Sequence, residues 1–470
     1  MHSSNVLTFG SNLAILFWIY PCNRKPSTTS FLVLNPTLIL RAGVIFLPRH
    51  LGAPTIREVP MLSIEGMMVL PEGTRIARVE IDTESGMITK VAEPVGSADI
   101  VLDSTKLVFP GFIDIHVHAR EDVTHSQDYK EDYLTASEAA IHGGLVAFAD
   151  MPNCPTPPVD DASYNAREAL TEKSAVTILL YAGIGPATNP LTHTVPYKAF
   201  MGHSMGDLFF SSRGELDSTL ARYEGQSVSF HCEDPKIMDE HKGDATHEAR
   251  RPAIAETSAV DTALLLIEKY NLKGKICHAS TIEAIQKIRD AKARGLNVTV
   301  EVTPHHLYFD ETQFPDHVPT QFQVNPPIRQ TKENRLALIK ALRSGDIDYL
   351  ATDHAPHSIE EKKSGMSGLT HLDTYGAFTT WLMHEHAFRP EDIARVCANG
   401  PGQFMNKFLP DKYGLIKEGY TGSITILAPN MPTEVRAEDL ETKCKWSPFE
   451  GVTFQGKVVI TIVKGKIYEC

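Results

Sequence analysis

Apolar and polar positions follow two different spacings along the middle of the chain. Eight short apolar runs, each of strand length, occur at residues 107–116, 144–151, 176–184, 196–201, 228–231, 275–278, 297–302 and 347–353. Between them lie stretches with apolar residues at helical spacing, as at residues 133–142, 162–173, 256–269, 281–294 and 332–343. Eight strand–helix units in series are typical of a (β/α)8 TIM barrel, so we predict an α/β protein built on this barrel.

Both flanks of this region alternate apolar and polar residues as strands do, and neither has helical spacing. Predicted strands at residues 67–70, 75–81, 88–91 and 100–102 precede the barrel, and strands within 422–427 and 452–468 follow it. We therefore predict that residues 61–108 and 418–470 pair into one small β-sheet domain. Residues 109–417 would form the barrel.

Residues 1–60 fit neither pattern. Their apolar runs, at 13–20 and 31–40, are bounded by prolines and polar residues and fall short of the roughly 20 residues that a spanning helix needs. They also lack a basic start, a single apolar core and a small-residue cleavage site, which together define a signal peptide. We expect an N-terminal extension outside the fold and no membrane association; an appended tail and an upstream start codon both remain open as its origin.

Charge and cysteine content narrow the partners and the compartment. The formal net charge is −13 and Lys and Arg form no dense run, whereas nucleic-acid binding needs a clustered basic surface. We therefore expect a small-molecule partner and no nucleic acid. Seven scattered cysteines without a CxxC pair indicate a reducing compartment, and we expect a cytoplasmic protein.

Polar residues collect where the apolar runs end, which in a barrel is the rim that carries chemistry. The first run ends at His116 and His118. Residues two apart on a strand face the same side, so this pair can bind one metal ion. By itself the pair is a weak indicator, because two histidines in a polar loop would have the same spacing.

Lys198 lies among apolar neighbours at the end of the fourth run. Burial disfavours the ammonium form, and a neutral amine can add CO₂ to form a carbamate whose two oxygens suit two cations. From this segment alone, a lysine that reaches the rim or pairs with a carboxylate is the simpler interpretation.

Later runs end at His231, His278 and Asp353, and any one of these could be an ordinary core residue. Six residues of ligand type at successive strand ends nevertheless predict a metal centre: His116, His118, Lys198, His231, His278 and Asp353. The imidazole-rich set favours zinc. Cys232 and Cys277 adjoin it, but strand alternation should turn them away, so we predict that both are packing residues.

The motifs around these residues resemble the amidohydrolase superfamily and, within it, the dihydroorotases, from about Met61 to Cys470. The similar segments are residues 111–118, 151–153, 324–329 and 352–357. One departure follows the histidine pair, where the family commonly has Leu-Arg-Glu-Pro-Gly and this chain has residues 119–123, Ala-Arg-Glu-Asp-Val. The departure bears on the geometry of this loop and on substrate affinity, and it leaves the metal chemistry untouched.

The resemblance implies two Zn²⁺ per subunit. One would be held by His116, His118 and Asp353 and the other by His231 and His278, with N6-carboxylated Lys198 and a hydroxide bridging them. It also implies substrate-binding roles for Arg120, Asn153, Asn325, His357 and the backbone near Gly365. Asp353 would in addition be the catalytic general acid/base.

The activity implied by the resemblance is reversible cyclisation of N-carbamoyl-L-aspartate to L-dihydroorotate, in de novo pyrimidine (UMP) biosynthesis. Two enzymatic alternatives share the metal ligands: an allantoinase and a hydantoinase or dihydropyrimidinase-type cyclic amidase. Arg120 argues against a hydantoinase or dihydropyrimidinase, because its guanidinium fits a carboxylate and the uncharged rings of those substrates have no need of it. Allantoinase, which takes a ureide, is the nearest enzymatic alternative. A non-catalytic amidohydrolase-like scaffold would have lost metal ligands, and none is lost here. The resemblance also allows a homodimer, which the sequence does not test.

Overall fold

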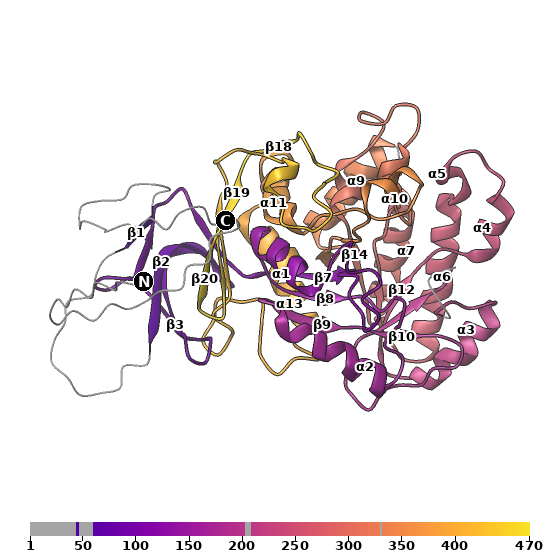
Figure 1. Cartoon of the computed structure of the whole chain (residues 1–470), viewed down its shortest axis with the longest axis horizontal. Helices are drawn as coiled ribbons and strands as arrows, with labels where there is room; N and C mark the ends of the chain where they lie inside the picture. Colours follow the sequence, from indigo (N-terminus) through magenta and orange to yellow (C-terminus); the bar gives the residue numbers. More distant parts are fainter. Residues whose placement is uncertain (1–43, 47–59, 203–207, 330) are drawn as a thin grey trace, which may run out of the picture.

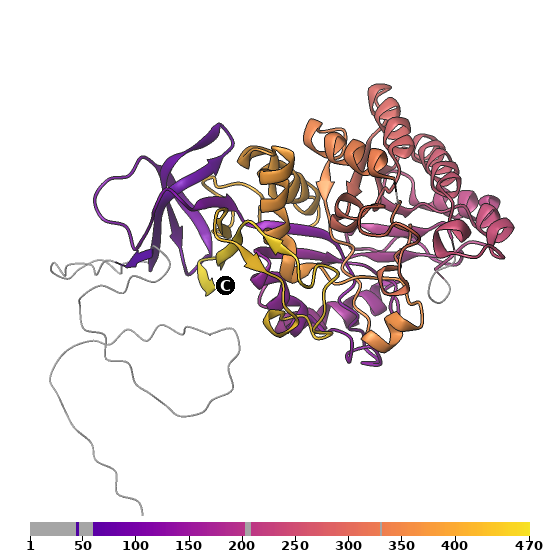
Figure 2. The same cartoon turned by 90° about the horizontal axis from the view of Figure 1, so that it is seen from above.

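The computed structural model describes residues 44–46, 60–202, 208–329 and 331–470. Figures 1 and 2 show a β-sheet at one end of the molecule and, beside it, a barrel of strands surrounded by helices. Most of the predicted N-terminal extension, residues 1–43 and 47–59, lies outside the described residues.

All neighbouring barrel strands run parallel. The strands are β7 (Phe112–Val117), β8 (Leu145–Asp150), β9 (Thr177–Leu180), β10 (Ala182–Ile184), β11 (Tyr197–Phe200), β12 (Ser227–His231), β13 (Lys273–Ile276), β14 (Val298–Val302) and β15 (Tyr349–Leu350). β9 and β10 are two parts of one apolar run, interrupted at Tyr181. A parallel bridge between Val117 and His354 joins the last strand end to the first. The ring therefore closes with the eight predicted strand positions, and the predicted (β/α)8 barrel is confirmed.

Thirteen α-helices are described. They are α1 (Tyr133–His142), α2 (Asp161–Glu168), α3 (Arg213–Leu220), α4 (Pro235–His241), α5 (His247–Arg250), α6 (Ala253–Lys269), α7 (Ile282–Ala293), α8 (Pro304–Tyr308), α9 (Lys332–Ser344), α10 (Ile359–Lys363), α11 (Tyr375–His386), α12 (Pro390–Ala394) and α13 (Gly400–Met405). Side-chain caps determine where several helices begin. At the start of α1 the Asp132 side chain accepts from the backbone N of Thr135, and the Thr135 side chain accepts from the backbone N of Asp132. At the start of α7 the Thr281 side chain accepts from the backbone N of Ala284.

The sheet beside the barrel combines strands from both flanks. It contains β1 (Val44–Phe46), β2 (Met61–Leu70), β3 (Gly73–Asp82), β4 (Met87–Ala92), β5 (Ile100–Leu102), β6 (Leu107–Pro110), β16 (Ile424–Ala428), β19 (Lys457–Val463) and β20 (Lys466–Glu469). β6 pairs with β16, and β16 pairs with β19, both antiparallel. The flanking segments thus share one sheet, as predicted. Two further short strands, β17 (Thr433–Glu434) and β18 (Thr453–Phe454), pair with each other in a separate two-stranded sheet.

The sheet and the barrel have separate hydrophobic cores. The core of the sheet includes Ile64, Val79, Ile100, Ile426 and Ile462, while the larger cluster fills the barrel and the space beneath its helices. Two separate cores favour the predicted division into a β-sheet domain, residues 61–108 and 418–470, and a barrel domain, residues 109–417. The exact domain boundaries stay a prediction.

One short segment departs from the expectation for residues 1–60. β1 (Val44–Phe46) pairs antiparallel with β5, with Val44 opposite Leu102. The physical reason is that an edge strand leaves a row of backbone N–H and C=O groups open to pairing. An extension expected to lie outside the fold therefore contributes three residues to the sheet.

Gly143, which ends α1, gives a test of the packing against the barrel. It is buried, and a Cβ built there would lie 1.8 Å from the backbone oxygen of Leu372. We predict that Gly143→Ala lowers the free energy of unfolding by roughly 1–3 kcal/mol, because backbone must move to admit the methyl group. Gly243→Ala is the matched control, since nothing lies within 4 Å of a Cβ there. Equal denaturant midpoints for the two variants would contradict the prediction.

Candidate metal centre

The six predicted ligands lie at or just after the ends of barrel strands. His116 is on β7, Lys198 on β11 and His231 at the end of β12. His278 and Asp353 follow β13 and β15. Because the carboxyl ends of parallel strands meet at one rim, residues from distant parts of the sequence converge there.

Five of these side chains converge in the structure. Asp353 Oδ1 lies 3.1 Å from His116 Nε2 and 3.0 Å from His118 Nε2. His231 Nδ1 lies 3.0 Å from His278 Nε2. The ligand atoms of His116, His278 and Asp353 all lie within 4.8 Å of one another. The structure thus brings the imidazoles and the carboxylate together as the sequence predicts, while their roles as ligands remain a prediction.

The donor set fits bound cations. The Nδ1 atoms of His118 and His278 are buried without a hydrogen-bond partner in the described part of the chain, a state that costs free energy. Burial is the main cause that holds the pKa of His116, His118 and His278 well below the ordinary value. These imidazoles are therefore neutral, which is the form that binds a metal. Converging imidazole nitrogens with a carboxylate are typical zinc ligands.

Lys198 is fully buried on β11. Its Nζ donates to Cys277 Sγ at 2.9 Å and lies 5.3 Å from the centroid of the Phe200 ring. Lys198 therefore does not reach solvent at the rim, and no carboxylate pairs with it among the described residues. Neither of the two simpler interpretations of this lysine matches the structure. A buried amine at this position favours carboxylation, which stays a prediction.

Cys277 corrects one prediction. Strand alternation was expected to turn it away from the ligands, yet its Sγ accepts from Lys198 and lies within 4.8 Å of ligand atoms of His116 and Glu301. The physical reason is that β13 ends at Ile276 and His278 has φ +36°, so the alternation of a strand no longer applies. Cys232, in contrast, is buried and contacts the carbonyl of Phe230.

Glu301, on β14, is a site residue that the sequence analysis missed. It is fully buried and contacts His116 Nδ1 and Lys275 Nζ, and its Oε1 accepts from the backbone N of His278 at 3.2 Å. A carboxylate on Nδ1 fixes the ring of His116 with Nε2 towards Asp353. The available signal was a charged residue inside an apolar run, and Lys275 on β13 is a second example.

Backbone strain is concentrated at the site. Arg120, His278 and Asp353 have φ values of +65°, +36° and +52°. For residues with side chains such conformations cost about 1–3 kcal/mol each and persist where the surroundings fix them. Each of the three follows a barrel strand, and the turn redirects its side chain.

The predicted substrate-binding residues are only partly brought together. Arg120 is buried, with Nη2 3.1 Å from His357 Nε2 and Nε donating to Pro356 O at 3.1 Å. Asn325 Oδ1 accepts from Ser367 Oγ at 3.1 Å, and Asn153 Oδ1 is buried with no partner among the described residues.

The backbone near Gly365 was predicted to line the pocket, and this role stays a prediction. A Cβ built on Gly365 would lie nearest the side chains of Gln323 and Thr320. Gly368, in the same loop, is the glycine that lies against Ala355 and His357, and its φ of +139° requires glycine. Gly368 therefore brings the predicted loop against the site.

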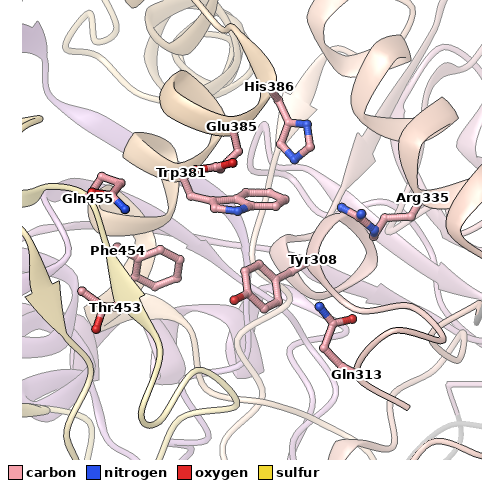
Figure 3. Close-up of a pocket in the computed structure, with 9 residues that line it drawn as sticks. All are labelled: Tyr308, Gln313, Arg335, Trp381, Glu385, His386, Thr453, Phe454 and Gln455. Carbon is pink, nitrogen blue, oxygen red and sulfur yellow. The ribbon is translucent and has the colours of Figure 1, made fainter. Parts of the chain in front are cut away.

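A separate cavity lies on the outer side of the barrel, between α8, α9, α11 and β18 (Figure 3). Its volume is about 300 Å³. It is lined by Tyr308, Gln313, Arg335, Trp381, Glu385, His386, Thr453, Phe454 and Gln455. None of the predicted site residues lines it, so we assign it no part in the chemistry at the rim.

Comparison with known proteins identifies the class. The model of the amidohydrolase family matches residues 107–468, so the chain belongs to the amidohydrolase family. It is thus a hydrolytic enzyme, a cyclic amidohydrolase, as predicted.

Curated relatives and solved structures agree with this class. The dihydroorotase of Pyrococcus furiosus is 31% identical over 86% of this chain and 91% of its own length, and that of Thermococcus kodakarensis is 32% identical over 86% and 94%. Among solved structures, L-hydantoinase (dihydropyrimidinase) from Arthrobacter aurescens has a TM-score of 0.78 at 23% identity, covering 87% of this chain and 96% of its own. A D-hydantoinase (dihydropyrimidinase) from Thermus sp. has a TM-score of 0.73 at 22% identity, covering 86% and 94%. At these identities the structural likeness bears on the fold.

Among the described residues, no helix has both the length and the apolar character needed to cross a bilayer.

Lys198 gives the test of the metal centre. We predict that Lys198→Ala lowers the zinc content of the purified protein from two ions per chain to one or none, because a bridging ligand is lost. Lys407→Ala, at a lysine exposed on the surface, should keep both ions. Metal analysis of the two variants measures this, and native mass spectrometry of the wild type should detect one added CO₂. Full zinc content in Lys198→Ala would exclude a bridging role.

Proposed function

We propose that the protein is a dihydroorotase, which interconverts N-carbamoyl-L-aspartate and L-dihydroorotate in pyrimidine biosynthesis. The observation that carries the proposal is Arg120, a buried guanidinium beside the metal centre, held by His357 and by the carbonyl of Pro356. The names of the curated relatives support the same activity.

Arg120 fits a substrate with a carboxylate. L-Dihydroorotate carries one outside its ring, and a guanidinium binds such a group through two parallel N–H donors. Within the described part of the chain the Nη1 atom of Arg120 makes no hydrogen bond, so its donors are available to a ligand. Asn153 and Asn325 would add amide groups, and Gly368 would let the backbone approach the substrate.

The metal ligands are proposed as the sequence analysis assigns them. His116, His118 and Asp353 would hold one zinc ion, His231 and His278 the other, and carboxylated Lys198 would bridge. When bound, the two ions would polarise the scissile amide carbonyl and acidify a water molecule. Glu301 would keep His116 oriented throughout.

Asp353 is the proposed general acid/base. It lies between His116 and His118 and is largely buried. Burial is the main cause that raises the pKa of its carboxyl to about 7 in the metal-free protein, and bound cations would lower that pKa. In ring opening Asp353 accepts a proton from the attacking water and donates it to the departing ring nitrogen. Cyclisation uses the same transfers in reverse.

The alternatives fit less well. Hydantoinase and dihydropyrimidinase substrates are uncharged rings that leave Arg120 without a partner, and an allantoinase would take a ureide. A non-catalytic scaffold would not need five converging ligand side chains. The cytoplasmic location and the homodimer stay predictions.

Substrate preference tests the proposal. We expect the zinc-loaded enzyme to turn over L-dihydroorotate in preference to allantoin and dihydrouracil. Arg120→Ala should lower kcat/KM for L-dihydroorotate by roughly 100-fold, because hydrogen bonds between charged groups are lost. Arg389→Ala, at an exposed arginine directly before α12, is the control. Preference for an uncharged ring, or full activity of Arg120→Ala, would refute the dihydroorotase assignment while leaving a cyclic amidohydrolase.

A further inference from the structure

His357 lies between two cationic side chains. Arg120 Nη2 is 3.1 Å from its Nε2, and Lys130 Nζ is 3.3 Å from its Nδ1. The imidazole is buried, and Trp446 Nε1 donates to the His357 carbonyl at 2.8 Å, which holds the backbone in place. The ring therefore has little freedom to turn away from either cation.

The hydrogen-bond donors around the ring decide its protonation. Arginine and lysine side chains only donate, and a neutral imidazole has one N–H and one acceptor nitrogen. A neutral imidazole accepts only one hydrogen bond, so Arg120 and Lys130 cannot both donate to this ring. Lys130 Nζ lies closer to Glu361 Oε1, at 2.9 Å, than to Nδ1, at 3.3 Å, so we assign its hydrogen bond to Glu361. Arg120 then donates to Nε2, and the proton of the ring is on Nδ1. Glu361 Oε2, 3.4 Å from Nδ1, is the only acceptor found there among the described residues. The pKa of His357 is lowered by burial first and then by Arg120 and Lys130, which agrees with a neutral ring.

Glu361 is itself held by several donors. Its Oε1 accepts from Tyr129 Oη at 2.7 Å and from Lys130 Nζ at 2.9 Å. Its Oε2 accepts from the backbone N of Ser358 at 2.9 Å, in the cap of α10. A carboxylate fixed by three donors offers His357 an acceptor at one defined position.

We propose that Glu361 and Lys130 are positioning residues for carboxylate selectivity. Glu361 keeps the proton of His357 on Nδ1, so that Nε2 accepts from Arg120 and the guanidinium keeps its other donors for the carboxylate of the substrate. Lys130 fixes Glu361 and adds a second positive charge behind the ring. This role rests on the proposed function, and it predicts an effect on KM for an anionic substrate rather than on kcat.

The test combines kinetics with the protonation state of His357. We expect Glu361→Leu, which removes the acceptor, to raise KM for L-dihydroorotate by roughly 10-fold and to change kcat less than about threefold. Glu361→Gln keeps an acceptor oxygen and should restore most of the affinity. Lys130→Met should also raise KM. Glu391→Leu and Lys292→Met are matched controls, because each breaks a hydrogen-bonded pair elsewhere.

Nitrogen NMR of the histidine-labelled holoenzyme gives the second measurement, with the His357→Gln spectrum assigning the signal. We expect an Nδ1 proton in the wild type and in Glu361→Gln, and its loss or transfer in Glu361→Leu. An Nε2 proton or a doubly protonated ring in the wild type would overturn the inference. Unchanged KM in both Glu361→Leu and Lys130→Met would overturn it as well.

Failure of the two proposals can be told apart. A wild type that ignores L-dihydroorotate but shows the expected His357 protonation and its loss in Glu361→Leu refutes the proposed function alone. An active wild type with an unaltered KM in the variants refutes the positioning role alone. Circular dichroism checks that each variant is folded. If Glu361→Leu does not fold, the KM of Lys130→Met tests the positioning role, and the NMR spectrum of the wild type tests the protonation state of His357.

Discussion

The buried carboxylate of Glu301 is the interaction on which the rest of the site depends. It contacts His116 and Lys275, and it accepts from the backbone of His278. Removing a charge from water costs several kcal/mol unless partners compensate it, and here one carboxylate compensates Lys275 while orienting two histidines. The strands β7, β13 and β14 that carry these groups are thereby fixed relative to one another at the rim.

Hydrophobic spacing was enough to predict most of the fold. The helix predicted at residues 133–142 has those bounds in the structure, because Asp132 caps it and Gly143 ends it. Two strands were less predictable. The apolar run 176–184 gives no sign of the interruption at Tyr181, and the run 347–353 yields only Tyr349–Leu350. Apolar character reports burial, whereas a strand also needs backbone pairing, which depends on neighbours distant in the sequence.

Site residues that lie at strand ends could be predicted from the sequence. Site residues whose role depends on contacts with distant parts of the chain could not. Position along each strand was sufficient to predict the convergence of His116, His231 and Asp353. Cys277 was predicted wrongly because alternation was extended past the end of β13. Other contributors, Glu301, Lys130 and Glu361, gave little signal, since their importance lies in partners 185, 227 and 232 residues away.

The left-handed backbone at Arg120, His278 and Asp353 sets a limit on how robust this enzyme can become. Glycine at any of these positions would relieve the local conformational penalty and would also delete a side chain on which the chemistry depends. At these three positions of the rim, a substitution that increases thermal stability would therefore decrease catalytic activity. Substitutions that stabilise the protein without loss of activity must therefore lie elsewhere, in the barrel helices, the surface loops or the separate core of the sheet.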